Sequence, residues 1–81
     1  MTKLDKLIAK LKNANNTFSW SDLVTLFSRL GYTKYERSGS RVVFMDAEEN
    51  ALHLHKPHPE NTIKGGALKA TKQHLIKRGI L

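Results

Sequence analysis

Three of the four histidines in this chain fall within six residues, in the segment HLHKPH that starts at His53. These histidines are His53, His55 and His58. The ordinary pKa of imidazole lies near neutrality, so the ring can accept or donate a proton at cellular pH. Because alternate residues of a strand point to the same side, His53 and His55 would share one face of a strand. On a small basic protein, this pattern points first to phosphodiester chemistry on RNA.

Charge and composition narrow the possible functions. The 81 residues include 14 Lys and Arg against 7 Asp and Glu, a formal net charge of +7. This charge suits a polyanionic partner, either nucleic acid or an acidic protein. The length predicts a single domain over residues 1–81 with no room for a large cofactor pocket, so we expect no cofactor. The absence of cysteine excludes disulfides and is typical of a cytoplasmic protein, and no segment approaches the ~20 apolar residues of a membrane span.

Three helices are predicted from the hydrophobic spacing and the capping residues. The first covers about residues 2–13 and the second starts after Ser19, a good N-cap, and ends at Gly31. The predicted buried stripe of the second helix is Trp20, Leu23, Val24, Phe27 and Leu30. The last helix is predicted at residues 66–78 with Gly79 as its stop, Leu68, Leu75 and Ile76 facing inward, and His74 on the surface.

Three strands are predicted between the second and last helices, at residues 32–37, 41–45 and 51–56. A tight turn at residues 38–40 and a polar turn at residues 46–50 separate them, and Pro57 and Pro59 end the third strand. The predicted fold is therefore α+β in the order α-α-β-β-β-α. Its three-stranded antiparallel sheet has one face covered by helices and one open face.

The open face is predicted to carry the candidate chemistry. Placing Leu52 and Leu54 against the core puts His53 and His55 on the open face. Placing Val42 and Phe44 against the core puts Arg41, Val43 and Met45 on the open face, whereas the opposite register would bury the charge of Arg41. Tyr35 and Arg37 extend this face from the first strand, and Lys56 and His58 lie at its rim.

Cleavage of RNA without a metal needs a base for the 2′-hydroxyl proton, an acid for the departing 5′-oxygen and a cation near the phosphate. Two histidines and Arg41 on one sheet face can supply these groups. Exposed histidines without a role are the alternative interpretation of the same pattern. A metal site of His53, His55 and His58 is a third one, but Pro57 and the lack of cysteine or a well-placed carboxylate argue against it, so no metal is expected.

From about Ser21 to Ile80 the chain resembles the HicA family, the toxin half of HicAB toxin–antitoxin systems. The resemblance rests on the order and spacing of five short motifs: Leu30-Gly31-Tyr32, Gly39-Ser40, Pro57-His58-Pro59, residues 64–68 (KGGAL) and Arg78-Gly79-Ile80. It implies a double-stranded-RNA-binding-like α-β-β-β-α fold over about residues 18–81, cleavage of mRNA independently of the ribosome, and neutralisation by a HicB antitoxin. The helix at about residues 2–13 is extra relative to this pattern.

The chain departs from the family motif at one position. The family's usual Gly-Ser-His carries a catalytic histidine, but here Gly39-Ser40 is followed by Arg41. Arginine is effectively never deprotonated, so it cannot be the general base. Either His53 or His55 has taken over proton transfer, or the protein binds RNA without cutting it.

We therefore expect a cytoplasmic toxin that cleaves single-stranded or loosely structured mRNA without metal and leaves 2′,3′-cyclic phosphate ends. His55 is the first choice for acid or base and His53 the second, with Arg41 at the phosphate. Further RNA contacts are expected from Arg37, Ser40, Lys56, His58 and Lys64. The expected protein partner is a HicB-like acidic antitoxin, no membrane partner is expected, and the alternative function is a non-catalytic RNA-binding module of the same fold.

Overall fold

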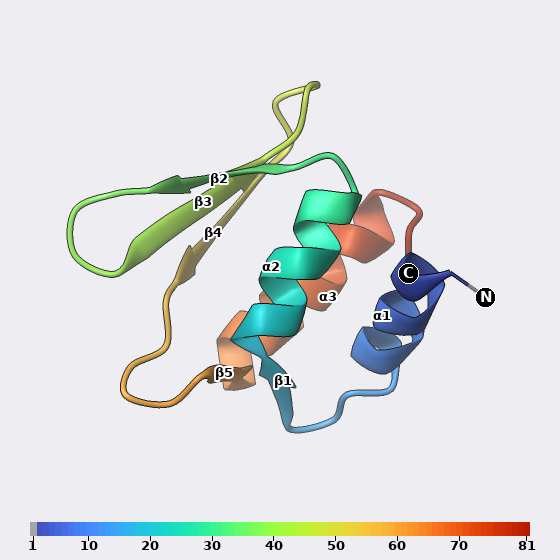
Figure 1. The fold of residues 1–81 in the computed structure, drawn as a ribbon, viewed down its shortest axis with the longest axis horizontal. Helices are drawn as coiled ribbons and strands as arrows, with labels where there is room; N and C mark the ends of the chain where they lie inside the picture. Colours follow the sequence, from blue (N-terminus) through green and yellow to red (C-terminus); the bar gives the residue numbers. More distant parts are fainter. Residues whose placement is uncertain (1) are drawn as a thin grey trace.

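The computed structural model describes residues 2–81, which form three helices and two antiparallel sheets (Figure 1). The helices are α1 (Lys3–Lys12), α2 (Trp20–Arg29) and α3 (Gly65–Lys77). The larger sheet has the order β2-β3-β4, built from β2 (Thr33–Glu36), β3 (Arg41–Met45) and β4 (Ala51–His55). Helices α2 and α3 contact this sheet, and α1 packs on α2 (Figure 1). The predicted α+β class and three-stranded antiparallel sheet are confirmed, and the arrangement is compatible with a double-stranded-RNA-binding-like fold.

The predicted element order was incomplete, because a second sheet was missed. Strand β1 (Thr17–Ser19) pairs antiparallel with β5 (Thr62–Lys64), and its central pair, Phe18 opposite Ile63, is buried. Strands of three residues are too short to show the alternation by which strands are recognised in a sequence. This small sheet joins the segment before α2 to the segment before α3, so it sets where both helices begin.

Local signals at the helix ends explain where α1 and α2 start and where α2 stops. The backbone N–H of Asp5 donates to the Thr2 hydroxyl at 3.1 Å and completes a capping box at the start of α1. The Ser19 hydroxyl accepts from the N–H of Asp22 at 3.3 Å, as predicted. Gly31 ends α2 with a φ of 90°, which favours glycine, and the N–H of Tyr32 donates back to the carbonyl of Phe27 at 2.9 Å.

The core lies between the larger sheet and the helices. Its largest fully buried side chains include Phe27 of α2 and Phe44 of β3, whose ring centroids lie 4.9 Å apart. Leu68 and Leu75 of α3 are buried as predicted. The prediction for Ile76 was wrong, because its side chain is 57 % exposed. Residues 68, 71 and 75 form the buried stripe of α3, and residue 76 is turned about 100° around the helix from residue 75. No helix within residues 2–81 is long and apolar enough to cross a bilayer.

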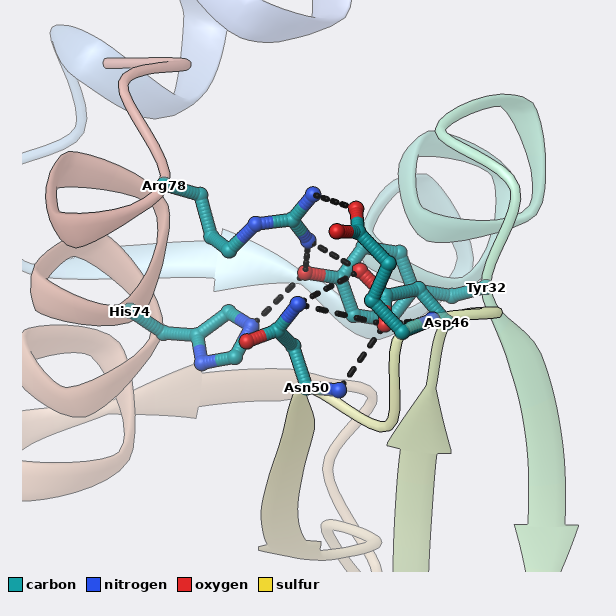
Figure 2. A network of polar contacts seen from close by, with 6 residues as sticks. Tyr32, Asp46, Asn50, His74 and Arg78 are labelled. Carbon is teal, nitrogen blue, oxygen red and sulfur yellow. Dashed lines mark hydrogen bonds and ion pairs between the residues drawn. The ribbon is translucent and has the colours of Figure 1, made fainter.

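A polar network joins the C-terminal end of α3 to the β3–β4 turn and to the residue before β2 (Figure 2). The guanidinium of Arg78 donates to the carboxylate of Asp46, and to the hydroxyl of Tyr32 at 2.6 Å. The hydroxyl of Tyr32 lies 2.8 Å from Nε2 of His74. The prediction that His74 is a surface residue was therefore wrong: the ring is half-buried and stacks on Phe27.

The geometry of this network is compatible with a neutral His74. Arginine can only donate, so the oxygen of Tyr32 accepts from Arg78, and the Tyr32 hydroxyl can direct its own proton to Nε2 of a neutral imidazole. Burial lowers the pKa of His74 below its ordinary value of 6.5, and the positive charge of Arg78 lowers it further. The geometry and the direction of the pKa shift therefore agree.

Asp46 organises the β3–β4 turn from its other side. Its carboxylate accepts hydrogen bonds from the backbone N–H groups of Asn50 at 2.8 Å and Glu48 at 3.0 Å. Burial would raise the pKa of Asp46, but the hydrogen bonds from Asn50 and the charge of Arg78 outweigh it and lower the pKa. An ionised Asp46 thus holds the turn closed and anchors Arg78 of the α3 terminus.

The state of His74 predicts a pH dependence of stability. Unfolded His74 takes up a proton near pH 6.5, whereas the folded group, with its lowered pKa, resists protonation. The unfolded state then binds more protons below that pH, so the free energy of unfolding should be highest above pH 6.5 and fall as the pH drops from 7.5 to 5.5. Urea unfolding at a series of pH values measures this change.

The variant His74→Gln keeps a side-chain carbonyl that can accept from Tyr32 but removes the titrating group, and it should show a smaller fall. His58→Gln makes the same change at an exposed loop residue and should behave like the unmodified protein. An undiminished fall in His74→Gln would contradict the assignment to His74.

Candidate functional site

The open face of the larger sheet carries the predicted site residues. Leu52 and Leu54 of β4 are buried, while His53 and His55, which alternate with them along the strand, are exposed, as predicted. In β3, Val42 and Phe44 belong to the core and Arg41 is exposed on the other side. The β2–β3 hairpin extends beyond the helices at the left of Figure 1, so no helix covers this part of the face.

The strand register places the site residues in rows across the face. Arg41 lies directly opposite His55, and Val43 lies opposite His53. On the other side of β3, Tyr35 lies opposite Val43. Side chains at directly opposite positions have Cβ atoms about 4.5–5.5 Å apart. One row is therefore Arg41 and His55, and the next row is Tyr35, Val43 and His53.

The turn between β2 and β3 holds the first row in place. Gly39 has a φ of 70°, and the N–H of Arg37 on one side of the turn donates to the carbonyl of Arg41 on the other side at 2.9 Å. The guanidinium of Arg41 donates to the hydroxyl of Ser38 at 3.1 Å. The hydroxyl of Ser40 lies 3.5 Å from Nδ1 of His55, at the outer limit of a hydrogen bond. Sequence reasoning missed Ser38, whose only signal was its position three residues before Arg41.

A shallow hollow of about 290 Å³ opens on this face. Its wall is formed by the side chains of two arginines and two histidines, with valine and leucine residues between them: Arg37, Arg41, Val42, Val43, His53, Leu54 and His55. Four of the predicted site residues thus line one hollow. Val43 is only 6 % exposed although it faces away from the helices, so the side chains around it already exclude much of the water.

A second hollow of about 350 Å³ begins on the other side of His55 and is lined by His58, Lys64 and the segment between them. His55 lines both hollows. Ser40 lies beside His55, and the backbone N–H of Lys56 donates to the carbonyl of Ser40 at 2.7 Å. Lys56 nevertheless lines neither of these hollows but a third one of about 470 Å³, with Trp20 of α2 and Lys34 of β2. The structure therefore brings together all the predicted site residues except Lys56.

The site is cationic and its arginines are free of carboxylates. Within residues 2–81, the cations that form ion pairs are Lys10, Lys64 and Arg78, so neither Arg37 nor Arg41 is paired. The acidic cluster of the sheet, Asp46, Glu48 and Glu49, lies in the β3–β4 turn at the opposite end. An unpaired guanidinium can bind a phosphate through two parallel hydrogen bonds.

The three neighbouring histidines do not gather into a metal-binding cluster. Across the described chain, residues 2–81, no three His, Cys, Asp or Glu side chains are close enough together to hold a metal ion. His53 and His55 lie on one strand face, whereas His58 lies in the loop after Pro57.

Comparison with known proteins assigns the chain to a family. A family model described as HicA toxin of bacterial toxin-antitoxin matches residues 20–77, from the start of α2 to the end of α3. The match leaves α1 and β1 outside. No curated protein and no solved structure matched the chain. The chain belongs to the HicA toxin family and is thus the toxin of a toxin–antitoxin pair, with a cognate antitoxin as its partner.

Proposed function

We propose that this toxin is an endoribonuclease that cleaves mRNA in the cytoplasm by proton transfer from its own side chains. The observation that carries the proposal is the row formed by Arg41 and His55 on the open face. The guanidinium of Arg41 has no carboxylate partner and lies opposite the exposed imidazole of His55. Arg41 itself occupies the position at which the family motif is expected to have a histidine. A phosphate bound by Arg41 would therefore lie within reach of His55.

The proposed reaction needs no group beyond the RNA and the protein. The 2′-hydroxyl attacks the adjacent phosphorus and loses its proton to an imidazole, while the bond from phosphorus to the 5′-oxygen breaks and that oxygen takes up a proton. One product ends in a 2′,3′-cyclic phosphate and the other begins with a 5′-hydroxyl. We assign proton transfer to His55 first and His53 second, and stabilisation of the phosphate charge to Arg41.

Further polar side chains extend the proposed RNA path on both sides of His55. Arg37 lines the first hollow, and His58 and Lys64 line the second, where Lys64 also pairs with Glu60 at 3.6 Å. Ser40 supports His55 from the turn. Lys56 is assigned to the RNA backbone outside the catalytic row, because it faces α2. Such phosphate contacts hold the strand in register without reading its sequence.

A non-catalytic RNA-binding function is the second candidate, and Arg41 in place of the motif histidine is the observation that favours it. Incubating the purified protein with RNA in EDTA separates the two. Cleavage supports the enzyme, and stable complexes with intact RNA support the binding module.

The assignment of His55 predicts that His55→Ala lowers the rate of RNA cleavage by about 100- to 10,000-fold, the range for loss of a general acid or base. The side chain is exposed, so the fold should persist, which circular dichroism checks. His58→Ala is the matched control: it removes an imidazole three residues away that we assign only to RNA contact, so a loss of a few-fold at most is expected. Undiminished cleavage by folded His55→Ala would overturn the assignment.

The assignment of Arg41 predicts different effects for two substitutions. Arg41→His restores the Gly-Ser-His motif and should keep or raise activity. Arg41→Ala should slow single-turnover cleavage more than it weakens RNA binding, because the guanidinium acts on charge that grows in the transition state. Equal losses in binding and in cleavage would show that Arg41 only anchors phosphate.

We further propose that the antitoxin is acidic and HicB-like and covers the open sheet face. Complementary charge would speed its association with a chain of net charge +7. Covering the row of Arg41 and His55 would exclude RNA and so neutralise the toxin. The helices already cover the other face of the sheet, which leaves the open face available.

Hydrogen exchange on the toxin–antitoxin complex tests this placement. We expect slower exchange in residues 51–59 than in the free toxin, since β4 and the following loop would be covered. Helix α1 provides the internal comparison, because it packs on α2 and shares no surface with the open face. Slowed exchange confined to the helices, with residues 51–59 unchanged, would contradict inhibition by covering the site.

A further inference from the structure

We propose that the open face also holds a nucleobase-binding subsite, formed by Tyr35 with Arg37, Val43 and His53, next to the phosphate position. The proposal rests on the proposed function, because it places the base of a nucleotide whose phosphate lies at Arg41 and His55. Its ligand is a single unpaired base of RNA.

Tyr35 is the residue that first indicates this subsite. Its side chain is 41 % exposed, although most large apolar side chains of the described residues are buried. It lies in the same row as Val43 and His53, next to the row of Arg41 and His55. Neighbouring rows on one face are separated by two residues of each strand, about 6.7 Å. A ring surface therefore lies one row away from the proposed phosphate position.

Arg37 gives the subsite a planar wall. Its guanidinium carbon lies 5.4 Å from the centroid of the Tyr35 ring, within the range of a cation–π contact. Arg37 also lines the 290 Å³ hollow, so one side of its guanidinium is backed by Tyr35 and the side chain borders the open space. Unpaired bases stack both on aromatic rings and on guanidinium planes.

The floor and the opposite wall are also present. Val43 lies between Tyr35 and His53 in the register and lines the bottom of the hollow, with 6 % of its surface exposed. Tyr35 and His53 are two strand spacings apart, about 9.6 Å, and Arg37, Val43 and His53 line the open space between the strands while Tyr35 lies behind Arg37. The hollow of about 290 Å³ is just below the range of ligand sites, ~300–1,000 Å³, and Arg41 and His55 also line it, so it suits one base with its phosphate rather than several bases.

This geometry determines the class of RNA that can bind. In an A-form duplex the base faces are stacked and the narrow major groove admits no side chains, so a paired base cannot enter the subsite. Single-stranded segments can turn one base out of the strand onto Arg37 and Tyr35. The subsite thus predicts a preference for unpaired RNA that phosphate contacts alone would not produce.

The experiment compares RNA with and without bases in the His55→Ala variant, which should bind without cleaving. The two ligands are a single-stranded octanucleotide and the same ribose-phosphate chain with abasic sites, and fluorescence anisotropy gives their dissociation constants. The expected result is at least about tenfold weaker binding of the abasic chain, as loss of aromatic stacking produces. Tyr35→Phe keeps the aromatic ring and should keep the ratio of the two dissociation constants. Tyr35→Leu leaves the net charge of the protein unchanged but removes the ring, and it should reduce this ratio several-fold.

Two different failures can be told apart. If both oligonucleotides bind equally well, or Tyr35→Leu keeps the full ratio, the subsite is overturned while phosphate binding stands. If neither oligonucleotide binds at low salt, the proposed function itself is contradicted, and the subsite with it.

Discussion

The pairing of β3 with β4 is the constraint on which the whole site depends. Its register is specified from both ends of the strands. On the helix side, Val42 and Leu54 form a buried opposite pair, and a slip by one residue would move them into water and the histidines into the core. At the acidic end, Asp46 closes the turn through the N–H groups of Glu48 and Asn50. The row of Arg41 and His55, at which we propose the chemistry, is thus positioned by apolar burial and by a turn at the far end of the sheet.

The network around Arg78 connects that turn to the rest of the fold. Arg78 lies after α3 and contacts both Asp46 and Tyr32, so the helix, the β3–β4 turn and the start of β2 share one set of hydrogen bonds. Asp46 and Tyr32 lie at the end of the sheet opposite the β2–β3 turn that precedes Arg41. The sheet therefore has two different ends. One is acidic and stabilises the fold, and the other carries arginines that are not paired with carboxylates. Only the second end suits a phosphate.

The expectation that Arg41 stands in place of a motif histidine has a physical interpretation in this register. Residue 41 and residue 55 are opposite each other, so their side chains reach the same point above the sheet from neighbouring strands. We infer that the imidazole and the cation can exchange places across this pair and still meet at one phosphate. Ser38, which accepts a hydrogen bond from Arg41, and Ser40, which lies 3.5 Å from His55, both belong to the turn that joins β2 to β3, so both groups contact the same short loop.

Much of this architecture could be predicted from the sequence, because it follows from local patterns. Alternation of apolar and polar residues located β3 and β4 and assigned His53 and His55 to the open face, and capping residues located the start of α2. The short strands β1 and β5 have no period to recognise, and the half-burial of His74 depends on Tyr32, forty-two residues away. Lys56 follows the end of β4, where strand alternation no longer decides which way a side chain points.

The chemistry of the RNA ends tests the central claim most directly, because it reports which oxygen attacked the phosphorus. Mass spectrometry of the products of a short RNA, cleaved by the purified toxin in EDTA, should show 2′,3′-cyclic phosphate and 5′-hydroxyl ends. A 2′-O-methyl group at the cleaved nucleotide should abolish the reaction, since the attacking hydroxyl is then absent. Products with 3′-hydroxyl and 5′-phosphate ends, or unimpaired cleavage of the methylated RNA, would contradict acid–base catalysis by the row of Arg41 and His55.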